Sequence, residues 1–123
     1  MRRHDTADDP AELARLHGRL MLDRQEAEAE LDAAEAAALP YEREFWARHE
    51  DLKMVLADGC GDLAPYYDRR MWAGVDAHPF RERVRAAKDW VRSVTCDLEA
   101  VEKRLSAADR AMAKRPRRQP SLF

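Results

Sequence analysis

The sequence predicts an all-α protein in which a long first helix and a long last helix pack as an antiparallel coiled-coil hairpin. Glycine (4) and proline (6) are scarce among the 123 residues, while Ala, Leu, Glu and Arg dominate, which suits long amphipathic helices. Apolar residues recur after His78 at alternating spacings of four and three. Acidic residues crowd the first third and basic residues follow His78, which favours antiparallel docking of these two segments.

One helical domain is expected over residues 9–114, between a disordered leader at residues 1–8 and a flexible tail at residues 115–123. The leader lacks the apolar core of a secretory signal, and no apolar run approaches membrane-spanning length. We therefore expect a cytoplasmic protein with free thiols and no membrane contact.

The first helix is predicted to begin at Asp9-Pro10-Ala11-Glu12. Asp caps a helix, Pro fits the first helical position and Glu12 can reach back to the cap amide. After Leu22, alanine replaces leucine along the apolar stripe. This shallow stripe would let a partner helix approach closely.

A shorter helical insert, residues 41–74, is expected to close one end of the hairpin. Leu39-Pro40 predicts a kink or break, because proline removes a backbone donor and biases its predecessor away from helix. A second helix, Tyr41 to Asp58, would end at Gly59-Cys60-Gly61, and Asp62 would cap a short helix through Trp72. Gly74 to Pro79 is predicted to be a connector.

The last helix carries the clearest pattern, a heptad seam over residues 80–112 that predicts a left-handed supercoil with a facing helix. The natural partner is the first helix. An alternative is that the seam drives homo-oligomerisation, as in a coiled-coil scaffold or assembly protein. The seam comprises Phe80, Val84, Ala87, Val91, Val94, Leu98, Val101, Leu105, Ala108 and Met112.

Catalytic signals are nearly absent, so the sequence predicts a protein that is not an enzyme and holds no cofactor or metal. There is no glycine-rich phosphate loop, GxSxG elbow or HExxH motif. No histidine pairs with another His or Cys at metal-ligand spacing; His49 is expected to be a packed or surface residue and Cys60 a small residue in a turn.

Two clusters outside the seam are candidates for binding. The aromatic tract, Ala64-Pro65-Tyr66-Tyr67 with Met71-Trp72, is interpreted as a small core that caps the hairpin, with a partner-binding surface as the alternative. A basic ridge on the last helix would contact phosphates or an acidic surface, or else be a solvated face beside the acidic first helix. Its members are Arg81, Arg85, Lys88 and Arg92.

The tail ends in an apolar pair, Leu122-Phe123, whose exposure to water is unfavourable. We therefore expect the pair to enter a pocket on another molecule; the alternatives are that it packs back onto the helical hairpin or is a terminal degradation signal. Pro116 cannot continue the last helix, so the final residues are expected to be accessible. Three arginines, Arg115, Arg117 and Arg118, precede the pair and would remain solvated, steering the tail toward an acidic surface or nearby DNA.

Gln119-Pro120-Ser121-Leu122-Phe123 resembles the short peptide with which many bacterial replication and repair proteins bind the DNA polymerase sliding clamp. That peptide has glutamine, a variable residue, usually Ser or Asp, then Leu and Phe. Gln119, Ser121, Leu122 and Phe123 match position by position, while Pro120 stands where leucine is common. The resemblance covers five residues and implies nothing about the helical body.

The resemblance implies a non-enzymatic interaction protein that docks on the sliding clamp and modulates DNA replication or repair. A phage or plasmid accessory protein, or an accessory subunit of a repair polymerase complex, would fit. The alternatives are the self-associating scaffold and a small nucleic-acid-binding regulator that uses the basic ridge and the basic tail, with DNA contact secondary.

Overall fold

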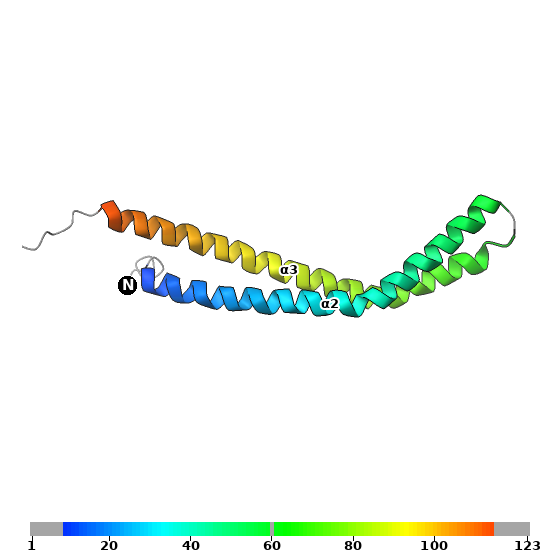
Figure 1. Ribbon diagram of the computed structural model, residues 1–123, viewed down its shortest axis with the longest axis horizontal. Helices are drawn as coiled ribbons and strands as arrows, with labels where there is room; N and C mark the ends of the chain where they lie inside the picture. The colour runs from blue at the N-terminus through cyan, green and yellow to red at the C-terminus, as the bar shows by residue number, and fades with distance from the viewer. Residues whose placement is uncertain (1–8, 60, 115–123) are drawn as a thin grey trace, which may run out of the picture. The chain divides into compact units, whose positions relative to one another are not determined.

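The computed structural model describes residues 9–59 and 61–114 and shows two long helices there without any strand (Figure 1). Helix α2 is Pro10–Asp58, with 49 residues, and helix α3 is Ala64–Lys114, with 51 residues. The predicted all-α class is confirmed. The leader, Cys60 and the tail at residues 115–123 lie outside the described residues.

The start of α2 forms as its sequence predicts. The Ala11 amide donates to Asp9 Oδ1 at 3.2 Å, and the Leu13 amide donates to the Asp9 carbonyl at 2.9 Å. Pro10 is the first helical residue, where its missing N–H costs nothing. The Asp9 cap therefore sets where α2 begins and hence which of its residues lie on the buried face.

The turn between the helices also follows its sequence signals. Gly59 has a φ of 70° and its amide donates to the Val55 carbonyl at 3.1 Å, so the left-handed conformation that glycine adopts cheaply ends α2. Asp62 Oδ1 accepts the Ala64 amide at 3.1 Å and caps α3. The predicted end near Gly59 and the predicted cap at Asp62 are both confirmed.

At Leu39-Pro40, where a kink or a break was predicted, α2 does not break, and the predicted connector at Gly74 to Pro79 is wrong because α3 runs through it. Pro40 lies inside α2 and Pro79 lies inside α3, so the insert expected at residues 41–74 is divided between two continuous helices. Both prolines are exposed. A proline ring deletes one backbone hydrogen bond, but it does not disturb the side chains that the helix buries on its other face.

The buried and half-buried side chains keep the same spacing through both prolines. In α3 the buried and half-buried positions alternate by four and three from Tyr66 to Ala108, well before the predicted start at Phe80. In α2 the same alternation runs from Leu13 to Val55, with two exposed positions, Arg24 and Tyr41. The predicted seam therefore starts earlier than expected, and Met112, its predicted last member, is exposed.

Packing divides the chain into two units, which we describe separately. Unit 1 combines Met1–Gln25 with Arg92–Phe123, and its described core is a leucine and valine cluster: Leu13, Leu20, Val94, Leu98 and Val101, with Leu105 against it. Unit 2 is Glu26–Val91. Its buried apolar residues are six alanines and one leucine: Ala27, Ala34, Ala38, Ala73, Ala77, Ala87 and Leu52.

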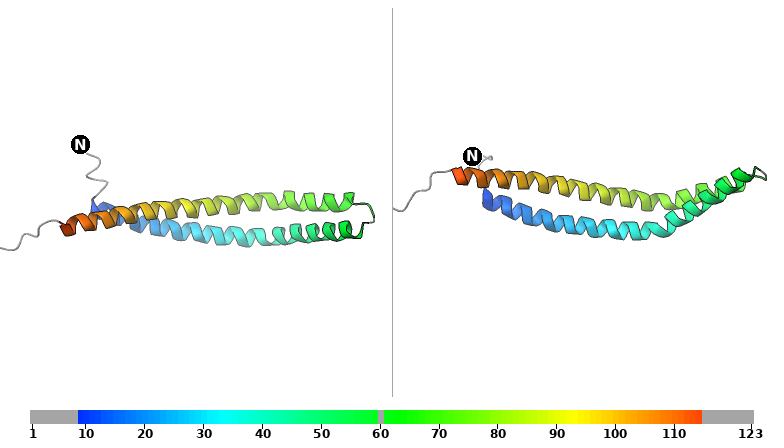
Figure 2. Two further views of the ribbon diagram at one scale, coloured as in Figure 1. Left: turned by 90° about the horizontal axis from the view of Figure 1, so that it is seen from above. Right: turned by 45° about the horizontal axis from the view of Figure 1, so that its top comes forward.

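Within each unit a segment of α2 lies beside a segment of α3, as both views of Figure 2 show. In unit 2 the ring of Tyr41 stacks on that of Phe80 with 4.0 Å between centroids. This contact sets Pro40 and Pro79 at the same level of the unit. Alanine side chains are small, so the two backbones of unit 2 can approach closely, but little apolar surface is buried between them.

Replacing Pro40 by alanine should stabilise the protein, because it restores a helical hydrogen bond and removes a ring that costs an interior helix position about 3 kcal/mol. We expect a gain of roughly 1–3 kcal/mol in the free energy of unfolding, measured by urea titration with far-UV circular dichroism. Pro10→Ala is the matched control and should change little, since Pro10 is at the first helical position. A Pro40→Ala variant that is less stable would contradict a continuous α2.

Leu98→Ala should destabilise the protein by about 2–4 kcal/mol, because it leaves a cavity in the core of unit 1 where Leu98 is only 3% exposed. The same urea titration measures the loss. Leu22→Ala makes the same chemical change at an exposed position and should cost less than about 0.5 kcal/mol. Equal losses for the two variants would contradict this core.

Candidate interaction surfaces

The candidate clamp-binding residues, Gln119 to Phe123, and the three tail arginines, Arg115, Arg117 and Arg118, lie outside the described residues. Helix α3 ends at Lys114, just before them. Their predicted role therefore stays a prediction. The other candidate residues belong to unit 2 and to the start of the α3 segment in unit 1, where their contacts are described.

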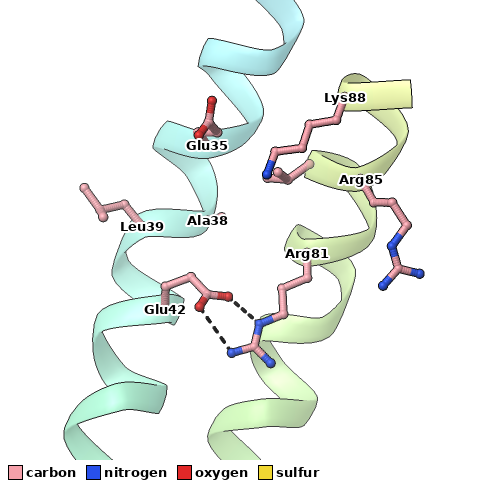
Figure 3. A pocket seen from close by; sticks show the side chains of 8 residues that line it. Glu35, Ala38, Leu39, Glu42, Arg81, Arg85 and Lys88 are labelled. Atoms are coloured by element: carbon pink, nitrogen blue, oxygen red, sulfur yellow. Dashed lines mark hydrogen bonds and ion pairs between the residues drawn. The ribbon is translucent and has the colours of Figure 1, made fainter. Parts of the chain in front are cut away.

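Arg81 of the basic ridge is held by contacts within unit 2. Its guanidinium makes a two-point ion pair with Glu42 on α2: Nε donates to Oε1, and Nη2 donates to Oε2 at 3.2 Å (Figure 3). The guanidinium also lies over the Phe45 ring, 4.5 Å from its centroid. Because the Arg81 guanidinium pairs with a carboxylate and stacks on an aromatic ring, few of its N–H donors remain for a phosphate.

The hydrogen bonds from Arg81 lower the pKa of Glu42 and, reciprocally, the same pair raises the pKa of Arg81. Partial burial of the Glu42 carboxylate opposes the shift, and a weaker hydrogen bond from Trp46 Nε1, at 3.3 Å, adds to it. Glu42 is therefore ionised in the folded state over a wider pH range than a free carboxyl group.

The other ridge residues are more open. Arg85 is on the same helix as its ion-pair partner Glu82, at 3.2 Å, and its side chain is 71% exposed. Lys88 and Arg92 are exposed. The predicted ridge thus divides into one residue committed to α2 and three that solvent reaches.

A second bridge between the helices involves Arg83, which is not part of the predicted ridge. Its Nε and Nη2 donate to Glu30 at 3.0 and 2.9 Å. The hydrogen bonds lower the pKa of Glu30, although both side chains are well exposed. The sequence contains one indication of this ion pair, since acidic residues crowd the first helix and basic residues begin the last one. That pattern predicted attraction between the helices but did not reveal which residues meet.

Sequence reasoning missed a groove of about 500 Å³ between α2 and α3 in unit 2, which we call the central groove (Figure 3). Ala38, Leu39 and Val84 supply its apolar surface, and charged side chains rise on both sides. It arises where the shallow alanine stripe of α2 passes the ion pair of Glu42 and Arg81. The lining residues are Glu35, Ala38, Leu39, Glu42, Arg81, Val84, Arg85 and Lys88.

The aromatic tract does not form the predicted capping core. Its residues lie in α3, and Tyr67, Met71 and Trp72 are all exposed, while Tyr66 is half-buried. A single pair of helices has no third layer to cover them, so the heptad alternation buries only Tyr66 of this tract. Exposed aromatic and sulfur-containing side chains are typical of protein interfaces, which was the alternative interpretation.

The remaining candidates for chemistry are dispersed. His49 Nδ1 lies 3.2 Å from Arg70 Nη1, and His17 Nε2 lies 3.2 Å from Glu102 Oε2 in unit 1. Cys96 is a free, exposed cysteine. Over residues 9–59 and 61–114 no three or more His, Cys, Asp or Glu side chains gather as metal ligands would. Neither described helix holds an apolar stretch long enough to cross a membrane.

Comparison with known proteins adds no relationship: no family model, no curated protein and no solved structure matches this chain. Functional inference therefore depends on the residues themselves.

Glu42→Gln should cost about 0.5–1.5 kcal/mol at neutral pH, because it removes the charge that Arg81 pairs with. The lowered pKa of Glu42 means that this stability is present above the ordinary carboxyl pKa of 4.5 and disappears as the pH falls through the folded-state value. Urea titrations across acidic and neutral pH measure the difference between variant and parent.

Glu44→Gln is the control for this pH dependence, since Glu44 pairs along its own helix, with Arg48, and is 60% exposed. It should cost less at neutral pH. A Glu42→Gln loss that stayed constant into strong acid would show that charge is not what Glu42 contributes.

Proposed function

We propose that this protein is a non-enzymatic adaptor that binds the bacterial DNA sliding clamp through residues 119–123 and so modulates replication or repair. The observation that carries the proposal is the match of Gln119, Ser121, Leu122 and Phe123 to the clamp-binding peptide. Such an adaptor would act in the cytoplasm, and a phage or plasmid accessory protein is one fitting origin.

Physical chemistry supports this role for the peptide. Leu122 and Phe123 would each contribute about 1.5–3 kcal/mol on entering an apolar pocket, before the costs of ordering the chain. Gln119 would fix the register by hydrogen bonding at the pocket rim. Pro120 restricts the free peptide to extended conformations, which lowers the entropy lost on docking.

For the body we propose an antiparallel coiled-coil hairpin that holds the second binding function of the adaptor. The alternating spacing of buried residues supports it, as do ion pairs that flank the seam on its two sides, Glu42 with Arg81 and Glu30 with Arg83. This body would present a surface to a partner or obstruct other proteins that use the clamp.

Two other functions rank lower because contacts within the chain compete with them. Self-association through the seam at residues 80–112 would have to displace α2, since Leu98 and Val101 pack with Leu13 and Leu20. In a nucleic-acid-binding role for the ridge, Arg81 would not be available because it pairs with Glu42. Arg85, Lys88 and Arg92 keep that role open to a direct test by salt-dependent DNA retardation.

The clamp proposal predicts that the full chain binds purified bacterial sliding clamp and that Leu122→Ala with Phe123→Ala lowers affinity at least about a hundredfold. The reason is the loss of two apolar anchors. Surface plasmon resonance with immobilised clamp gives the dissociation constants, and a peptide of residues 114–123 should compete.

The matched control is Met112→Ala with Leu22→Ala, which removes two exposed apolar side chains from the helices and leaves the tail intact. Its affinity should equal that of the parent chain. Equal binding by the parent and the Leu122→Ala, Phe123→Ala variant would reject a contact made by the motif.

A further inference from the structure

One face of unit 2 is built from two rows of side chains that flank the buried seam, and the central groove lies between them. Positions alternating by three and four share one side of a helix, so the residues that line the groove define the rows. We call this surface the groove face. Its α2 row is Glu28, Asp32, Glu35, Leu39, Glu42, Trp46, His49, Lys53 and Leu56, and its α3 row is Tyr67, Met71, Gly74, His78, Arg81, Arg85 and Lys88.

Most of the exposed apolar side chains of the groove face lie toward the turn and most of its charges toward the other end, with Lys53 near the turn and Leu39 among the charges as the exceptions. Leu39, Trp46 and Leu56 on α2, with Tyr67 and Met71 on α3, are large apolar residues that are 44–53% exposed. Gly74 has no side chain, and the Phe45 ring lies 3.3 Å from where its Cβ would be. A surface with this much exposed apolar material is typical of a binding site.

Away from the turn, the charges of the groove face are sorted by helix. The α2 row has four acids at its far end, Glu28, Asp32, Glu35 and Glu42, and no base between them. The α3 row has three bases at the same level, Arg81, Arg85 and Lys88, as the contact between Glu42 and Arg81 establishes. Because Glu42 and Arg81 pair with each other, a partner would best match this face with bases toward Asp32 and Glu35 on α2 and with acids toward Arg85 and Lys88 on α3.

We propose that the partner is a second copy of this chain, docked groove face to groove face. A two-fold axis parallel to the helices places α2 of each copy over α3 of the other. This rotation does not shift either copy along the helix direction. Acids then meet bases, with Glu35 of one copy opposite Arg85 and Lys88 of the other. Apolar residues meet near the turn, where Trp46 of one copy lies opposite the α3 row of the other, between Met71 and His78.

The charges also exclude the other face-to-face arrangement. A two-fold axis across the helices would put α2 over α2 with reversed levels, so that the acids Glu28 and Asp32 would cover the apolar residues near the turn. Like charges that meet and carboxylates placed on apolar surface both disfavour that arrangement. The parallel axis gives a four-helix assembly in which each helix runs antiparallel to both of its neighbours.

Two charge reversals test this pairing. Glu35→Lys sets the introduced lysine of each copy against Lys88 of the other, and Lys88→Glu sets the introduced glutamate against Glu35. Because each variant alone brings like charges together, each should dimerise at least about tenfold more weakly than the parent chain. Mixing the two variants brings the introduced lysine of one against the introduced glutamate of the other and keeps the second contact attractive. The mixture should therefore form a heterodimer with close to parental affinity.

Sedimentation velocity over a concentration series measures all of these samples, and far-UV circular dichroism checks that each variant folds. Trp46→Ala provides a second probe and should weaken the dimer, while Trp72→Ala, on the opposite face with Glu44 and Asp76, should not. A parent chain that stays monomeric throughout, variants that dimerise normally, or a mixture that fails to recover would each overturn the proposal. Because the tail is not involved, the Leu122→Ala, Phe123→Ala chain should dimerise as the parent does.

Discussion

The buried side chains that repeat by four and three along both helices are the constraint on which the rest of this structure depends. They continue through Pro40 in α2 and through Pro79 in α3, and both prolines are exposed to solvent. An interior proline costs a helix about 3 kcal/mol. Contacts along a face that extends for several turns on either side outweigh that cost, so each proline removes one hydrogen bond without ending its helix.

The identity of those buried residues differs between the two units. Unit 1 buries leucine and valine, whereas unit 2 buries mainly alanine. An alanine seam contributes little apolar burial, and solvent-screened ion pairs such as that of Glu30 with Arg83 add little more stability. Several large apolar side chains of unit 2, including Trp46 and Trp72, lie outside the seam, where another molecule can cover them.

Sequence reasoning succeeded where a local signal acts alone and failed where a local and a distant signal compete. The Asp9 cap, the turn at Gly59 and the Asp62 cap each depend on a few neighbouring atoms, and each was predicted correctly. Pro40 and Pro79 were misread because their local effect was judged without the heptad phase on both sides. The central groove was missed because it depends on which charges of α2 and α3 meet, which spacing along one helix does not reveal.

The tail and the groove face would reinforce each other if both proposals hold. A dimer formed through the groove face has two copies of the segment at residues 119–123. Once one copy docks, the second meets a nearby pocket at a high effective concentration, so overall affinity rises without any new contact. This gain requires a clamp assembly with two accessible pockets within reach. Charge reversal at Glu35 would then weaken clamp binding by the full chain while leaving the affinity of the isolated peptide unchanged, which separates avidity from recognition.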